Sequence, residues 1–111
     1  MAMELTKQQK KELKELIKVG INRGCQKWLD ETVELIQKPY DGDNPWDRSM
    51  QITKRSRDYF KETMRREDSF YRNDWLLFSV AALLNEGNLT KEDIQPFGED
   101  ITTAVQLIAS R

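Results

Sequence analysis

The chain has 111 residues, with 18 lysines and arginines, 19 aspartates and glutamates, and a net charge of −1. This length predicts a single domain over residues 1–111 that can bury roughly two thirds of its unfolded surface. Histidine is absent, which removes the usual general base near neutral pH and the commonest ligand of transition metals. A lone cysteine, Cys25, excludes an internal disulfide. We therefore expect a protein that is not an enzyme and that holds no cofactor and no metal.

The N-terminal stretch and the longest apolar run bear on localisation. Charged residues are spread from Met1 to Lys18, so a signal-peptide pattern is missing. The run from Trp75 to Leu84 has ten residues, about half of what a helix needs to span a bilayer. These features predict a soluble, cytoplasmic protein without a membrane partner.

The first predicted helix covers residues 6–38. Apolar side chains recur there at helical spacing, at Leu13, Leu16, Ile17, Ile21, Trp28, Leu29, Val33, Leu35 and Ile36. The period continues through Gly20 and Gly24, each of which costs about 1 kcal/mol relative to alanine in a helix. We expect one long helix. The alternatives are a break at the glycine pair or a close approach of another helix to it.

A loop at residues 39–45 precedes the second predicted helix, at 45–67. Asn44 is a suitable N-cap, Pro45 fits the first helical position, and Asp47 favours the positive end of the helix dipole. We expect this helix to pack through an inward stripe that consists of Trp46, Met50, Thr53, Phe60 and Met64.

The third predicted helix, at 73–86, contains the apolar run. Proline and glycine are absent between residues 46 and 86, so the break before this helix is inferred only from residues able to cap at 68–69 and 73–74. A continuous helix through this region is the alternative. Gly87 is suited to the left-handed exit from the helix.

Two further elements follow. Thr90 and Asp93 form a capping box at the start of a short helical turn at 91–95, and the last helix is predicted at 97–110. The whole pattern predicts an all-α fold, a compact bundle of four main helices with one short turn.

The apolar run is expected to lie at the centre of this bundle, because a helix that is apolar all round must be covered on every side. Three amphipathic helices of one chain would supply this cover, and we expect that arrangement. In the alternative, a homodimer, a second copy covers part of the run.

The segment 48–72 is basic, with eight basic and four acidic residues, whereas 73–111 has two basic and six acidic residues. Basic and aromatic residues interleave in 48–72, as in surfaces that bind a phosphate backbone and stacked bases. Two acidic residues, Asp58 and Glu62, fall between the basic strips at i,i+4 spacing, which is typical of a solvated, ion-paired face. Nucleic-acid binding is therefore the alternative interpretation, and the ion-paired face is the preferred one.

One acidic segment suggests a second alternative. Asp30-Glu31-Thr-Val-Glu34 resembles the first half of the carboxylate motif in all-α nucleotide pyrophosphatases, in which carboxylates one turn apart hold magnesium. The resemblance implies a magnesium-dependent nucleotide hydrolase. The second half of that motif, Glu-x-x-Asp on a neighbouring helix, is absent from this sequence. Surface pairing of these glutamates with lysine or arginine is the preferred interpretation.

By residue class and elimination, we expect a non-catalytic protein-interaction module, such as an adaptor, an inhibitor, or an immunity or antitoxin-like protein. Its partner is expected to be another protein. The residues predicted to bind it are Tyr40, Trp46, Lys54, Arg55, Lys61, Arg65 and Arg66. An acidic rim at Glu92, Asp93, Glu99 and Asp100 is a further candidate surface.

Overall fold

The computed structural model describes residues 4–111. Its elements are α1 (Lys7–Gln37), α2 (Pro45–Ser69), α3 (Leu76–Asn85), α4 (Lys91–Ile94), the 3₁₀ turn η1 (Gln95–Phe97) and α5 (Glu99–Ala109). The chain is 78% helical, with five helices and, in the part that is described, no strand. The predicted all-α helical bundle is confirmed.

Side chains cap most of the helix starts that the sequence predicts. Thr6 and Gln9 form a reciprocal capping box at the start of α1. The side chain of Asn44 accepts a hydrogen bond from the backbone N–H of Asp47 at the start of α2, and a second capping box opens α4. As a result, the predicted helices agree with the observed ones to within three residues at every end.

The largest of these differences is at α3, which begins at Leu76 instead of residue 73. The backbone N–H of Arg72 donates to the carbonyl of Ser69, and the N–H of Trp75 donates to the carbonyl of Arg72. The residues able to cap at 73–74 lie within this tight connection and leave α3 without a side-chain cap. The connection also rules out a continuous helix through α2 and α3.

The two glycines in the middle of α1 serve close packing, because α1 is a single continuous helix. A Cβ at Gly20 would lie 2.9 Å from Cδ1 of Leu83 and 3.1 Å from Cγ of Leu89. A Cβ at Gly24 would lie 2.8 Å from Nδ2 of Asn88. Both glycines therefore let α3 and the segment after it approach the backbone of α1.

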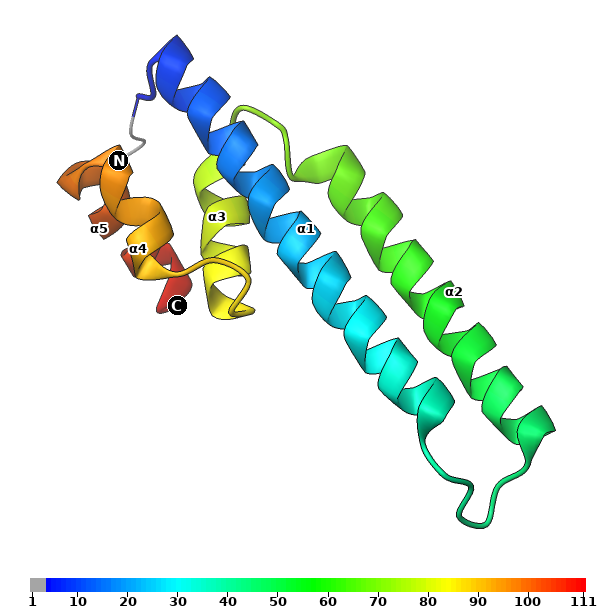
Figure 1. The fold of residues 1–111 in the computed structure, drawn as a ribbon. Helices are drawn as coiled ribbons and strands as arrows, with labels where there is room; N and C mark the ends of the chain where they lie inside the picture. Colours follow the sequence, from blue (N-terminus) through cyan, green and yellow to red (C-terminus); the bar gives the residue numbers. More distant parts are fainter. Residues whose placement is uncertain (1–3) are drawn as a thin grey trace.

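The hydrophobic core lies between the N-terminal half of α1 and helices α3, α4 and α5, which together we name the core bundle (Figure 1). Helix α3 packs against both α1 and α5 and is central, as predicted. The buried apolar side chains of the core are Leu13, Ile17, Phe70, Leu76, Val80, Ala81, Leu83, Leu89, Ile94, Ile101 and Val105.

The cover of α3 is nevertheless incomplete. The rings of Trp75 and Phe78 stack on each other with their centroids 4.6 Å apart, and they remain 45% and 40% exposed. The expectation that three amphipathic helices of one chain enclose the whole apolar run is therefore wrong at this edge. The physical reason is that α2 contributes no fully buried apolar side chain between Pro45 and Ser69.

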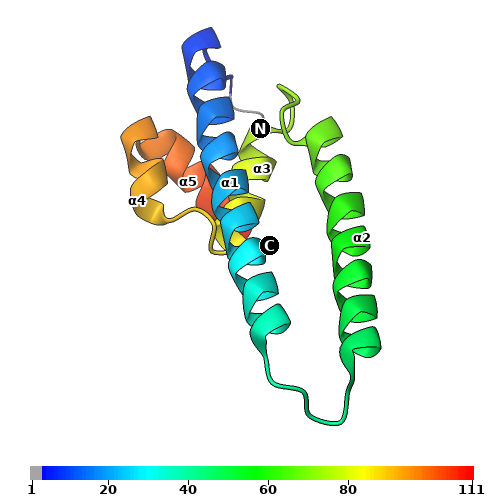
Figure 2. The same ribbon diagram turned by 45° about the vertical axis from the view of Figure 1, so that its right-hand side comes forward.

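Helix α2 instead forms an arm with the C-terminal half of α1 and the connecting loop (Figures 1 and 2). The molecule measures 54 × 25 × 24 Å along its principal axes, with a radius of gyration of 17.4 Å. A compact domain of this length has a radius of gyration of about 13 Å. The molecule is therefore more extended than a compact domain. We name the part formed by α2, the C-terminal half of α1 and the connecting loop the arm.

Candidate interaction site on the helical arm

The outer side of α2 carries the most unusual surface of the molecule. Trp46 is 71% exposed and Phe60 is 65% exposed, and both methionines of the same stripe are about half exposed. We name the six positions on this side the outer stripe: Trp46, Met50, Thr53, Arg57, Phe60 and Met64. The predicted inward orientation of this stripe is wrong, because its residues face away from α1 and from the core bundle.

The opposite side of α2 explains this orientation. Arg55 donates from Nε to the hydroxyl of Thr32 at 2.9 Å and from Nη2 to the carboxylate of Glu31 at 3.0 Å. Its guanidinium also lies 5.2 Å from the centre of the Trp28 ring. Helix α2 therefore turns charged side chains toward α1, where they meet polar partners, and leaves its apolar positions in solvent.

Arg48 joins the two helices at the tip of the arm. Its side chain is nearly buried, and its Nη1 donates to the carbonyls of Leu35 at 2.8 Å and Lys38 at 2.6 Å. It also pairs with the carboxylate of Asp43 at 3.1 Å and lies over the ring of Tyr40. One arginine thus satisfies backbone carbonyls at the end of α1 and sets the path of the loop.

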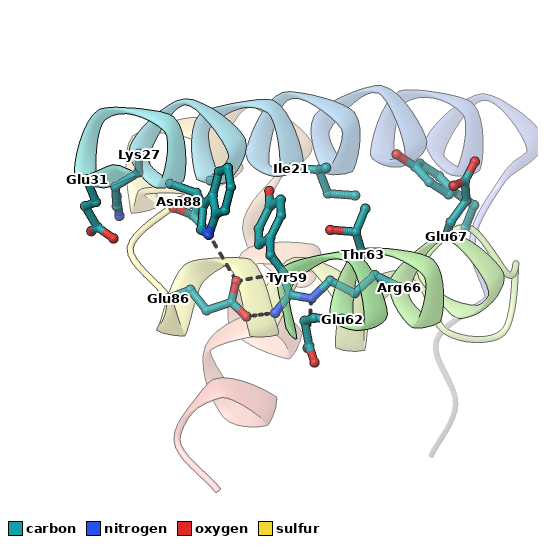
Figure 3. Close-up of a pocket in the computed structure, with 13 residues that line it drawn as sticks. Ile21, Lys27, Glu31, Tyr59, Glu62, Thr63, Arg66, Glu67, Glu86 and Asn88 are labelled. Atoms are coloured by element: carbon teal, nitrogen blue, oxygen red, sulfur yellow. Dashed lines mark hydrogen bonds and ion pairs between the residues drawn. The ribbon is translucent and has the colours of Figure 1, made fainter. Parts of the chain in front are cut away.

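The inner side of the arm and the core bundle enclose a cleft of about 520 Å³, shown in Figure 3. The rings of Trp28 and Tyr59 stack across it, with centroids 4.6 Å apart and planes 15° apart. The hydroxyl of Tyr59 donates to Sγ of Cys25 at 2.8 Å. Burial, together with this hydrogen bond, raises the pKa of Tyr59. The aromatic stack is therefore the main direct contact between the middle parts of the two long helices.

Arg66 closes the cleft on the side of α3. It forms ion pairs with Glu62, one turn earlier on α2, and with Glu86 at the end of α3 (Figure 3). The hydrogen bond that Arg66 donates to Glu86 raises the pKa of Arg66, and a hydrogen bond from Arg65 lowers the pKa of Glu62. The cleft is thus crossed by groups that stay charged and bind each other. The predicted i,i+4 pair of Glu62 with Arg66 is present.

The carboxylates near the cleft do not form a metal site. Glu31 pairs with Arg55, whereas Glu34 lies on the exposed surface of α1. Over residues 4–111, no three histidine, cysteine, aspartate or glutamate side chains lie close enough together to hold a metal ion. The structure therefore does not bring Glu31 and Glu34 together with the third carboxylate that a magnesium-dependent hydrolase would need.

One buried polar atom in this region has no hydrogen-bond partner in the structure. It is Oδ1 of Asn88, a side chain that lies beside Gly24 and donates from Nδ2 to Glu86 at 3.3 Å. Arg23 binds the same segment, because it donates to the backbone carbonyl of Asn88 and forms a 2.7 Å ion pair with Asp93. These contacts hold the connection between α3 and α4 against α1.

The seven residues predicted to bind a partner do not form one site. Two of them, Tyr40 and Trp46, are exposed at the tip of the arm. Arg55 and Arg66 point into the arm and the cleft, where they serve the internal contacts described above. The other three, Lys54, Lys61 and Arg65, lie on the exposed part of α2. The sequence interpretation did not find the outer stripe, because it placed Met50, Thr53, Phe60 and Met64 on an inward face and proposed only Trp46 of the stripe as a binding residue.

The basic residues of segment 48–72 also divide between internal contacts and the exposed surface. Arg48, Arg55 and Arg66 are committed to partners within the chain, and Arg65 is ion-paired with Glu62. A nucleic-acid interface would need the basic side chains gathered on one outer face. The structure instead distributes them over both sides of α2.

The arm carries a second, smaller apolar strip. Leu29, Val33 and Ile36 lie on α1 at one-turn spacing, and each is about half exposed. Together with the outer stripe, they make the arm the part of the molecule where exposed large apolar side chains are concentrated. Elsewhere such residues occur singly or as the stacked pair on α3. In the acidic rim, by contrast, Asp93 already forms an ion pair with Arg23 within the chain.

No helix between residues 4 and 111 has both the length and the apolar character to cross a membrane. No family model, no curated protein and no solved structure shows a significant match to this chain.

Proposed function

We propose that this chain is a non-catalytic protein-interaction module of the cytoplasm, of the adaptor, inhibitor or immunity-like kind, and that the outer stripe of α2 binds its partner. One observation carries the proposal. Helix α2 directs Arg48, Arg55 and Arg66 toward partners within the chain and leaves its large apolar side chains Trp46, Met50, Phe60 and Met64 toward solvent, which is the reverse of an ordinary amphipathic helix in a monomer.

The energetics of the stripe support a binding role. Full burial of one large apolar side chain stabilises a structure by about 1.5–3 kcal/mol. The four large side chains of the stripe, Trp46, Met50, Phe60 and Met64, are between 45% and 71% exposed. Covering them would therefore contribute about 3–7 kcal/mol before the entropic costs of association. Clusters of exposed apolar side chains mark interaction sites in soluble proteins, and the stripe holds two of them, Trp46 with Met50 and Phe60 with Met64.

The spacing of the stripe indicates what kind of partner it fits. Its six positions follow one another at three and four residues along a single helix, with the large apolar side chains at its two ends, as in helices that dock into an apolar groove or against a second helix. Aromatic residues and methionine are enriched at the centres of protein interfaces. A polypeptide with a complementary apolar helix or groove is therefore the expected partner.

A non-catalytic role is supported by the residues near the cleft. The sequence contains no histidine, and the carboxylates of Glu62 and Glu86 are bound to Arg66. The single thiol, that of Cys25, accepts a hydrogen bond from the hydroxyl of Tyr59.

Photo-crosslinking from defined positions tests the proposal. A photoreactive phenylalanine analogue is placed at Phe60 and, as a matched control, at Leu107, which is similarly exposed at 62% but lies on α5. We expect light-dependent crosslinks to a polypeptide from residue 60 and none from residue 107. Excess unlabelled chain should compete, and its Phe60→Glu variant should not. Equal crosslinking from both positions, or none from residue 60, would refute the proposed role of the stripe.

A further inference from the structure

The outer stripe has the spacing of a coiled-coil seam. Its six positions, Trp46, Met50, Thr53, Arg57, Phe60 and Met64, follow one another at intervals of four, three, four, three and four residues. This alternation repeats every seven residues and keeps the side chains along one line of a helix that packs against another helix. Among residues 4–111, no element covers that line, and Figure 2 shows α2 with its far side open. A second helix is therefore missing from the seam.

We infer that this second helix is α2 of another copy of the chain, running antiparallel, so that the protein forms a homodimer through the outer stripe. This inference rests on the proposed function and names its partner. In antiparallel pairing, a position of one heptad class meets a position of the other class. With the two helices centred at the level of Arg55, Trp46 meets the partner's Met64, Met50 meets the partner's Phe60, and Thr53 meets the partner's Arg57.

These pairings are complementary in shape and chemistry. Both aromatic residues of the stripe belong to one heptad class and both methionines to the other, so every aromatic ring meets a thioether. Sulfur–aromatic contacts of this type are favourable, and methionine adapts to the shape of a neighbouring ring. In the two central layers, Thr53 of each chain meets Arg57 of the other, so these layers are polar. A polar residue at a seam position fixes the alignment of the helices at some cost in stability.

The charges beside the seam favour the same arrangement. Asp47 and Lys61 flank the stripe on one side and are separated by 14 residues, or about 21 Å along the helix, so they cannot meet within one chain. In the antiparallel alignment, each of them lies beside the other residue of the partner, which gives two symmetric opposite-charge pairs. Lys54 meets its own copy at the centre, and Asp58, one turn away in each chain, offsets that repulsion in part.

A parallel dimer fits the sequence less well. Each seam residue would meet its own copy, so Arg57 would face Arg57 of the partner subunit. The flanking positions on the other side of the seam are Ser49, Ser56 and Thr63, which carry no charge. A parallel arrangement would therefore bring no acidic side chain opposite a basic one. In the antiparallel dimer, Ser49 and Ser56 instead line one side of the contact and allow the helices to approach closely, next to Thr63, which also borders the cleft.

Chemical crosslinking of single cysteine variants tests both the dimer and its direction. The variants are built on Cys25→Ser in the full chain, which leaves no native thiol. In the antiparallel alignment, Ser56 lies opposite its own copy across the twofold axis, whereas Ser49 is about 21 Å from its own copy and lies opposite the partner's Thr63. Ser56→Cys alone should give a covalent dimer with a short bismaleimide, and Ser49→Cys alone should not. A mixture of Ser49→Cys and Thr63→Cys chains should crosslink with each other.

Charge reversal gives an independent readout by sedimentation equilibrium, in which the unmodified chain should approach twice its 13.1 kDa mass as concentration rises. Asp47→Lys and Lys61→Asp should each raise the dissociation constant by about 3–10-fold, because each places like charges side by side. The double reversal should recover most of the affinity. Phe60→Glu should raise the constant by more than about 100-fold while circular dichroism shows an unchanged helical content.

Each outcome decides between the possibilities. Crosslinking of Ser56→Cys without Ser49→Cys, together with rescue by the double reversal, supports the antiparallel homodimer. Equal crosslinking of both single variants would overturn it in favour of a parallel dimer. A chain that stays monomeric up to near-millimolar concentration would refute the homodimer. In that case, a crosslink from residue 60 to a different polypeptide would leave the proposed function standing, and its absence would remove both.

Discussion

Replacement of Phe60 by alanine tests whether the outer stripe is surface or core in the monomer. A fully buried phenylalanine loses about 3–5 kcal/mol of folding stability on truncation to alanine. Phe60 is 65% exposed, so only about a third of that loss applies, or about 1–1.7 kcal/mol. Alanine also favours the helix over phenylalanine by about 0.5 kcal/mol. The expected net destabilisation is therefore about 1 kcal/mol or less.

The measurement is urea unfolding followed by circular dichroism, in dilute solution where association is suppressed. Leu83→Ala is the matched control, because Leu83 is fully buried in the core bundle and its truncation should cost about 2–5 kcal/mol. If Phe60→Ala destabilised the dilute chain as much as Leu83→Ala does, Phe60 would have to pack inside the monomer. The orientation of α2, and with it the proposed interaction surface, would then be wrong.

Three further predictions concern the contacts that hold the arm and the core bundle. Arg48→Met should destabilise the chain by about 2–3 kcal/mol, since it removes several charge-assisted hydrogen bonds. Measured hydrogen exchange should rise at the tip of the arm and remain unchanged in α3. Gly20→Ala should cost about 1–3 kcal/mol in thermal unfolding despite its better helix propensity, because its Cβ would strike Leu83; an increase in stability would contradict the close packing. Arg23 and hydrogen bonds from the backbone at residue 90 lower the pKa of Asp93 from 3.8 to about 2, so the stability that this group contributes is present above pH 4 and is lost as the pH falls toward 2. Asp93→Asn should lower the free energy of unfolding by about 1 kcal/mol at neutral pH, because the Arg23 side chain of the pair is half exposed. It should also flatten the fall in stability between pH 4 and 2, and an unchanged fall in that range would contradict the prediction.

Several features of the fold follow from local sequence. Thr6, Asn44 and Thr90 mark helix starts because a capping side chain satisfies backbone N–H groups within three residues of itself. Gly87 has a φ of 78°, in the left-handed region predicted for the exit from α3. The ten-residue apolar run predicted the centre of the core, since no other stretch of the chain is apolar on all sides.

The cleft could not be predicted in the same way. Its contacts join residues far apart in the chain, such as Trp28 with Tyr59 and Arg66 with Glu86. No local pattern distinguishes these residues from others of their type on the same helices. The exposure of Tyr40 and Trp46 was within reach of the sequence, because Tyr40 lies in a loop that contains two prolines and a glycine and Trp46 lies next to it.

The sequence by itself determined where the helices begin and end, and which residues of α2 share a face. Helical periodicity groups Trp46, Met50, Phe60 and Met64 on one side and Arg48, Arg55 and Arg66 on the other, whatever lies beside the helix. Only the tertiary structure decided which side meets α1. The aromatic ring of Trp28 and the polar groups of Glu31 and Thr32 give Arg55 partners within the chain, so the apolar side of α2 is left exposed.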